Sequence, residues 1–261
     1  MRFAVTTGLN GSPNLPAAAK KWAVQLNVPY LARVSKGNLE KILLENNLDA
    51  LIVATNKGPQ VFSCEGTLFF HPWMAALRLK SLMQGGKDNF VEALGLKRGM
   101  KVLDCTMGLA GDATIASHIC GDTGRVVALE ASEPVWFVVT NGLKSYMDED
   151  ENLIKAFHRI ETVQTTADDY LKDLPDNSFD VVYFDPMFRK PIQDSANFKP
   201  MRAIANMEQL QSKALVEALR VAKKRVVIKE TKDSMEFKRL NISQIYGGKY
   251  SSVSYGVIDK G

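Results

Sequence analysis

The chain has 261 residues, of which 46% are hydrophobic and 24% are charged, and its formal net charge is +4. This composition excludes a disordered or fibrous protein, and the length allows one large α/β domain together with a smaller one. No apolar run approaches the roughly 20 residues of a membrane span, and the first residues do not read as a signal peptide, so we expect no membrane association.

The first 72 residues alternate strand-like and helical segments and contain no recognisable catalytic motif, so we expect a small N-terminal α/β module at 1–72. The predicted strands are 1–7, 28–33 and 48–54, the predicted helices are 17–26 and 38–46, and a hairpin is predicted from 60–63 and 67–70. Asn38 is the expected N-cap of its helix.

A larger domain is expected at 73–261, beginning with a helix at 73–83 and a second helix capped by Asp88 and closed by Gly95. His71, Trp73, Arg78 and Lys80 could line a substrate entrance, or could form a packed aromatic corner with solvated cations.

The segment Val102–Asp112 (VLDCTMGLAGD) predicts a strand, a glycine turn and the start of a helix. In a doubly wound sheet, this first strand–turn–helix unit is where a nucleotide-like ligand binds. Gly108 and Gly111 would permit a tight bend and close approach of the backbone to that ligand. Asp104 ends the strand and Thr106 replaces the first glycine of a dinucleotide fingerprint. This disfavours a pyrophosphate and favours a ligand with an amino group and a sulfonium, so NAD is the second choice.

Two further acidic positions follow strands. Glu130 stands nineteen residues after Gly111, close to the spacing of an acid that binds ribose hydroxyls. Asp168 follows the next strand and could hold an adenine amine, whereas Asp169 could merely cap a short helix at 170–174.

The apolar strand 180–184 leads into Asp185-Pro186-Met187-Phe188. This sequence resembles the (D/N)PP(Y/F) motif of enzymes that methylate exocyclic or amide nitrogens. The carboxylate and the Pro186 carbonyl can accept the two amine hydrogens and aim the nitrogen lone pair, and Phe188 can stack on a base. A plain Asp-Pro turn is the alternative reading.

Four segments, DCTMGLAGDAT, ALEASEPV, VVYFDPMF and KKRVVIKE, together resemble the bacterial small-subunit ribosomal RNA guanine-N2 methyltransferases from about residue 69 onward. The resemblance implies a Rossmann-like class I methyltransferase sheet, mostly parallel with a C-terminal antiparallel hairpin, and S-adenosyl-L-methionine (AdoMet) as cofactor. A helix at 207–222, a strand at 224–229 and a hairpin of 242–246 and 250–258 are consistent with it.

Carried over by this resemblance, the cofactor positions fall on Gly111, Asp112, Glu130, Ala131, Thr166, Ala167, Asp168 and Asp185. Gly111 and Ala131 stand where that family has arginines, so two cations are missing near the expected cofactor.

Residues 189–239 carry thirteen Lys or Arg and six Asp or Glu, an uneven share of positive charge. Arg189, Lys190, Lys199 and Arg202 are expected on a loop beside the target pocket, where, with Met187, they would contact RNA. The alternative is a charged lid with no nucleic-acid role.

Cys64, Cys105 and Cys120 have no CxxC pairing and no histidine at zinc-ligand spacing, so we expect reduced, buried thiols, no metal and a cytoplasmic location.

We therefore predict an AdoMet-dependent N-methyltransferase that acts on an exocyclic amine of RNA, namely guanine N2 of small-subunit rRNA, naked or in the ribosomal subunit. Asp185, Pro186 and Phe188 are the predicted catalytic residues. Three alternatives stay open. One is a DNA adenine or protein amide N-methyltransferase, although Asn is more usual than Asp for an amide substrate. The others are a non-catalytic AdoMet-binding module and an NAD-dependent oxidoreductase.

Overall fold

The computed structural model describes residues 1–9, 11–33, 38–186, 204, 212–248 and 251–260. Six residues of the predicted site lie outside the described residues: Met187, Phe188, Arg189, Lys190, Lys199 and Arg202. The start of the helix predicted at 207–222 also lies outside them. Contacts group the described chain into two units. The first unit consists of Met1–His71 and Ser132–Ser145. The second unit consists of Pro72–Ala131 and the described residues of 146–186 and 212–260. A division into modules after residue 72 stays a proposal.

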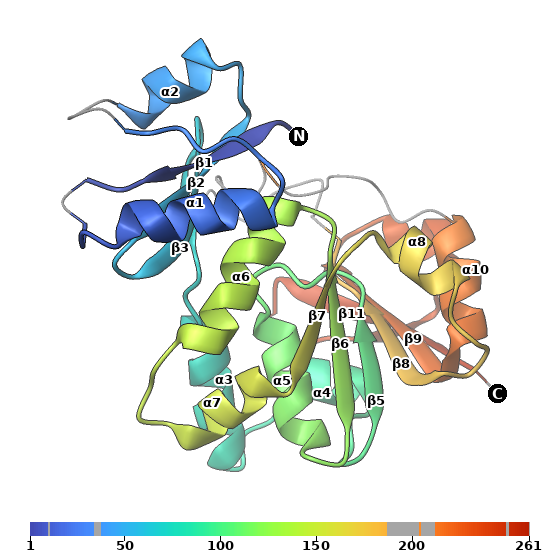
Figure 1. Ribbon diagram of the computed structural model, residues 1–261. Coiled ribbons are helices and arrows are strands. Elements are labelled where there is room, and N and C mark those ends of the chain that lie inside the picture. Colours follow the sequence, from blue (N-terminus) through green and yellow to red (C-terminus); the bar gives the residue numbers. More distant parts are fainter. Residues whose placement is uncertain (10, 34–37, 187–203, 205–211, 249–250, 261) are drawn as a thin grey trace. The chain divides into compact units, whose positions relative to one another are not determined.

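The first unit is built on a four-stranded sheet in the order β1-β2-β3-β4 (Figure 1). Its strands are β1 (Phe3–Thr7), β2 (Ala50–Thr55), β3 (Gly58–Ser63) and β4 (Gly66–Phe69). β1 runs parallel to β2, and β2, β3 and β4 pair antiparallel, so the predicted hairpin is confirmed. Its helices are α1 (Leu15–Gln25), α2 (Leu39–Glu45) and α6 (Glu133–Ser145).

Local capping in this unit follows the sequence, but one predicted strand is wrong. The Asn38 side chain accepts a hydrogen bond from the Glu40 N–H at 3.1 Å, as an N-cap should. Residues 28–33 form only one bridge, between Tyr30 and Val5, because Pro29 has no N–H with which to extend a ladder. Cys64 lies exposed in the hairpin turn, contrary to the expectation of a buried thiol.

The second unit contains a seven-stranded sheet in the order β10-β11-β9-β8-β5-β6-β7 (Figure 1). Its strands are β5 (Lys101–Asp104), β6 (Arg125–Glu130), β7 (Ile160–Gln164), β8 (Phe179–Phe184), β9 (Ala222–Thr231), β10 (Gln244–Tyr246) and β11 (Val253–Asp259). The pairs among β5 to β9 are parallel, and β11 pairs antiparallel with β9 and β10. The predicted class I methyltransferase sheet with its C-terminal antiparallel hairpin is confirmed.

The second unit also contains helices that pack on this sheet or on one another. They are α3 (Trp73–Met83), α4 (Asn89–Leu94), α5 (Gly111–Cys120), α7 (Glu151–His158), α8 (Ala167–Lys172), α10 (Ser212–Val221) and α11 (Glu236–Arg239). Helix α7 has no counterpart in our expectations. Alternation along β8 sends Phe184 into the core that includes Leu215 of α10, and turns Tyr183 toward Phe90 of α4, with ring centroids 5.0 Å apart.

The strand order reverses at β5, whose neighbours are β6 on one side and β8 on the other. In open parallel sheets, ligands bind beyond the carboxyl ends of the strands at such a reversal. Asp104, Glu130 and Asp185 all stand at or just after these three strand ends.

Candidate functional site

The loop after β5 is tied to both neighbouring strands. Asp104 is 2% exposed and accepts a hydrogen bond from the Thr106 N–H at 3.0 Å. Thr106 Oγ1 in turn accepts from the Asp185 N–H at 2.6 Å, and the Met107 N–H donates to the Leu129 carbonyl at 2.7 Å. The ends of β5, β6 and β8 are therefore held together by this single loop.

The glycine turn leaves the start of α5 accessible. Gly108 and Ala110 have φ of +51° and +60°, in the left-handed region, and Ala110 serves as N-cap without a side-chain cap. A Cβ at Gly111 would meet no atom within 4 Å. The N-terminus of α5 thus presents its first N–H groups beside open space, which suits an approaching ligand.

Glu130 faces this turn from the end of β6. It is 7% exposed, and its Oε2 accepts from the Gly108 N–H at 3.2 Å. The neighbouring Ala131 carbonyl accepts from the Gln164 side chain at 3.1 Å, and the Glu130 carbonyl accepts from the Thr165 N–H at 3.1 Å. The loops after β6 and β7 are therefore joined.

The loop after β7 leads into α8, which begins at Ala167 rather than at residue 170. Thr166, not Asp169, is its N-cap: its Oγ1 accepts from the Asp169 N–H at 3.1 Å and donates to the Asp169 carboxylate at 2.9 Å. Asp169 also pairs with Lys172 at 2.7 Å. The predicted capping role of Asp169 is wrong because Thr166 stands three residues ahead of it, the spacing of a capping box.

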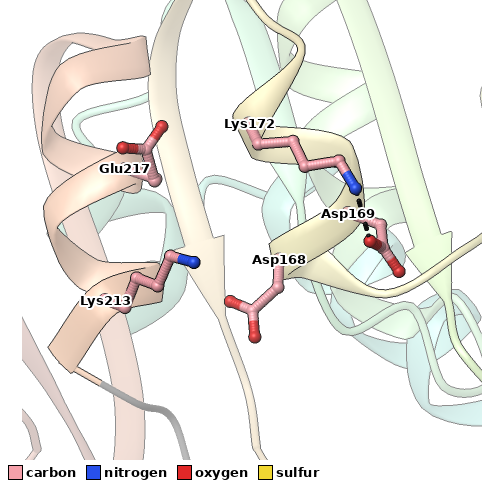
Figure 2. A pocket seen from close by; sticks show the side chains of 5 residues that line it. All are labelled: Asp168, Asp169, Lys172, Lys213 and Glu217. Carbon is pink, nitrogen blue, oxygen red and sulfur yellow. Dashed lines mark hydrogen bonds and ion pairs between the residues drawn. The ribbon is translucent and has the colours of Figure 1, made fainter.

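Asp168 lines a pocket of about 330 Å³ between α8 and α10, together with Asp169, Lys172, Lys213 and Glu217. Figure 2 shows the side chains of Asp168 and Lys213 directed toward the same space. All five lining side chains are charged, whereas pockets for small molecules are mostly apolar. This pocket therefore places Asp168 at an accessible surface, but it is not by itself an adenine pocket.

A chain of alternating charges lies behind Asp185. Lys229 of β9 donates to Asp185 Oδ2 at 2.7 Å and to Asp112 Oδ2 at 3.1 Å. Arg78 of α3 pairs with the other Asp112 oxygen at 2.5 Å and with Asp88 at 2.8 Å. Five side chains from five segments of the second unit thus form one ion-pair cluster.

Burial and these charges act in opposite directions on the pKa values. Burial raises the pKa of Asp104 to about 8. Burial also raises the pKa of Asp112, but the charges of Lys229 and Arg78 outweigh it and leave that pKa below its usual value. Burial lowers the pKa of Lys229, but Asp112 and Asp185 outweigh it and raise the pKa above its usual value. Lys229 is therefore a permanent cation.

Burial sets the pKa of Asp185 as well. It raises that pKa despite the opposing charge of Lys229. The carboxyl that follows β8 is consequently harder to ionise than a surface aspartate, and its charge depends on its partners.

Sequence reasoning missed Lys229 and Tyr183 and misjudged Arg78. The Tyr183 hydroxyl donates to Asp112 at 2.7 Å from within β8. Arg78 binds Asp88 and Asp112 rather than being only a solvated cation. A lysine at the end of the apolar run VVIK was the one available signal for Lys229, because an interior lysine needs a partner.

The sheet has the strand order of a class I methyltransferase, and acidic residues stand at or just after the carboxyl ends of β5, β6 and β8. Residues 64–251 match the family model described as "Putative SAM-dependent methyltransferase". The chain therefore belongs to this family of AdoMet-dependent methyltransferases, and AdoMet is its cofactor.

The chain is also similar to known proteins and to a solved structure. The chain is 37% identical over 255 residues to "Uncharacterized protein YpiP" of Bacillus subtilis, covering 97% of the chain and 98% of that protein. It is 31% identical to the ribosomal RNA small subunit methyltransferase J of Cellvibrio japonicus, covering 84% of each. The crystal structure of the SAM-dependent methyltransferase NGO1261 from Neisseria gonorrhoeae has the same fold, with a TM-score of 0.65, 16% identity, and coverage of 97% of this chain and 94% of that one.

Proposed function

We propose that this methyltransferase transfers the methyl group of AdoMet to an exocyclic amine of RNA, namely guanine N2 of small-subunit rRNA. The observation that carries the proposal is the position of Asp185 and Pro186. They follow the end of β8, and the Asp185 N–H donates to Thr106 Oγ1. The N–H of the same threonine donates to Asp104. In this proposal, a carboxylate and a carbonyl that can accept the amine hydrogens lie next to the carboxyl end of β5.

The side chains at this edge fit the chemistry of AdoMet, which has two ribose hydroxyls, an amino group and a sulfonium. Glu130 provides a carboxylate at the end of β6, where ribose hydroxyls are bound in such folds. Asp104 provides a second carboxyl, and the open space at Gly111 allows backbone approach. We assign the remaining contacts to these residues: Thr106, Gly108, Asp112, Ala131, Thr166, Ala167 and Asp168.

The chemistry assigned to the chain is orientation of a poor nucleophile. AdoMet, when bound, supplies an electrophilic methyl group. The lone pair of an aromatic amine is delocalised into its ring, so the nitrogen is a poor nucleophile until its two hydrogens are held so that it approaches tetrahedral geometry and its lone pair leaves the conjugated system. In our proposal, the Asp185 carboxylate and the Pro186 carbonyl accept those two hydrogens, and Phe188 stacks on the base. Neither a metal nor a covalent intermediate is required.

The RNA target is supported by two independent features. The Cellvibrio japonicus relative is named for methylation of small-subunit ribosomal RNA. The sequence from 189 to 239 has a local excess of positive charge, with Arg189, Lys190, Lys199 and Arg202 next to the Asp-Pro motif. Positive side chains of this kind neutralise phosphates in nucleic-acid complexes.

The proposal is tested by methyl transfer from labelled AdoMet to small-subunit RNA and to assembled subunits from a strain that lacks this protein. Analysis of the product nucleosides should give N2-methylguanosine. At saturating AdoMet, Asp185→Ala should lower the rate by about a hundredfold or more, whereas Asp173→Ala, at an exposed aspartate, should not change it.

Each of the other outcomes points to a specific alternative. Label in DNA or in protein instead of RNA would contradict the proposed substrate. Normal activity of Asp185→Ala in cells, together with AdoMet binding but no transfer in vitro, would indicate a non-catalytic module.

A further inference from the structure

Lys229 of β9 reaches Asp185 because β9 runs beside β8 and continues past its end. β8 and β9 pair in parallel with Phe184 opposite Ile228, so Asp185, the first residue after β8, lies beside Lys229. The contact is short, 2.7 Å from Lys229 Nζ to Asp185 Oδ2, and the lysine side chain is only 18% exposed.

The ammonium group is held from a second side. Asp112 Oδ2 lies 3.1 Å from Lys229 Nζ, and the same oxygen accepts from the Tyr183 hydroxyl at 2.7 Å. The other Asp112 oxygen is paired with Arg78. A cation fixed between two carboxylates in a mostly buried position keeps its proton, so it cannot serve as the base for a substrate amine.

Among the described residues, the other groups that act on Asp185 are mostly acidic or neutral. The titratable groups that act on Asp185 or Lys229 are Asp104 of β5, Asp112 of α5, Arg78 of α3, Tyr183 of β8, Glu230 of β9 and Tyr255 of β11. Within the described part of the chain, Lys229 is the one cation in direct contact with the Asp185 carboxylate. Without it, a half-buried carboxyl (27% exposed) beside other carboxylates would take up a proton more readily than a surface aspartate.

We propose that Lys229 is a positioning residue for methyl transfer. It keeps Asp185 ionised and holds its Oδ2, so that Oδ1 accepts a hydrogen of the target amine. A protonated Asp185 would present a hydroxyl donor to an amine that needs an acceptor. This inference rests on the proposed role of Asp185 in accepting the amine.

The test is the pH dependence of the single-turnover rate with Lys229→Met. Loss of the cation should move the acid limb of the profile upward by about 1 to 3 pH units. The rate at neutral pH should fall by about tenfold to a hundredfold and recover at higher pH. Lys229→Arg keeps the charge and should keep the acid limb close to its wild-type position. If Lys229→Met does not fold, Lys229→Gln removes the charge, keeps a donor on a shorter side chain and should show the same shift.

Lys224→Met is the matched control, because Lys224 lies on the same strand and pairs with a different aspartate, Asp180, at 3.1 Å. It should leave the profile unchanged. A uniform loss of rate with Lys229→Met at every pH would indicate a merely structural role and overturn the inference, as would an unchanged profile.

A second readout does not depend on turnover. Carbon-13 NMR of the Asp185 carboxyl, assigned with Asp185→Asn, should show a higher pKa in Lys229→Met than in the wild type, with and without AdoMet. If the wild type fails to methylate RNA, the proposed substrate is wrong, and this titration still decides the role of Lys229. An unchanged pKa of Asp185 would overturn that role.

Discussion

At the scale of single residues, the balance between burial and nearby cations sets the pKa of each carboxyl. Asp104, Asp112 and Asp185 lie close together, yet their pKa values differ in direction. Burial dominates at Asp104 and Asp185, whereas two cations dominate at Asp112. Asp104, with a pKa of about 8, carries a proton at neutral pH in the ligand-free protein. Binding of a cationic ligand beside it favours the ionised form, so ligand binding and loss of this proton are linked.

We predict that AdoMet binds more tightly as the pH rises. Between about pH 6 and about pH 7.5, below the range in which an α-amino group titrates, the Kd should fall by up to about tenfold per pH unit. Calorimetry in buffers of different ionisation enthalpy should detect release of a proton on binding. Asp104→Asn should remove this pH dependence; a dependence of equal size in that variant would show that another group is responsible.

At the scale of elements, Arg78 joins three helices. It extends from α3 to Asp88, the N-cap of α4, and to Asp112 in the first turn of α5. Its side chain is 23% exposed and those of its partners are 11% and 10% exposed, so the pairs are screened less than surface ion pairs. These contacts fix the start of α5, and with it the open edge at Gly111.

Arg78→Met should therefore destabilise the protein by about 3 kcal/mol, because it leaves two mostly buried carboxylates each with one cation fewer. Urea unfolding followed by circular dichroism measures the change in the free energy of unfolding. Arg125→Met is the comparison: Arg125 is 47% exposed in its pair with Glu161, and its loss should cost less than about 1 kcal/mol. Equal costs for the two variants would argue against a buried cluster.

At the scale of the whole molecule, the uneven distribution of charge matters more than the net charge of +4. Within the described chain no helix is long and apolar enough to cross a bilayer. The residues from 189 to 239 contain more than a third of the lysines and arginines of the chain. A concentrated positive segment favours a polyanionic partner over a neutral one.

We predict that the double variant Lys199→Ala, Arg202→Ala binds RNA more weakly and depends less on salt. The slope of log K against log salt concentration should decrease by about 1 to 2 if each side chain contacts one phosphate. Fluorescence anisotropy across a salt series measures this slope. AdoMet affinity should not change, and RNA binding equal to that of the wild type would leave these residues without an RNA role.

The sequence was sufficient to predict features that depend on local order. Asp88 caps the start of α4 and Gly95 caps its end, as predicted. The apolar runs that end at Asp104 and Phe184 are strands of the predicted parallel sheet. These assignments succeed because caps and strand periodicity involve neighbours in the chain. The strand predicted at 28–33 is wrong for a local reason too: Pro29 has no N–H, so only a single bridge forms, at Tyr30.

Thus, the sequence by itself determined the strand–turn–helix order, the acidic strand ends and the class of enzyme, because each of these features depends on residues within a short segment of the chain. Only the tertiary structure decided which charges meet. Arg78 and Asp112 are 34 residues apart, and Lys229 and Asp185 are 44 apart. Such pairs form because parallel strands bring distant segments to one edge of the sheet, where burial leaves each charge in need of a partner.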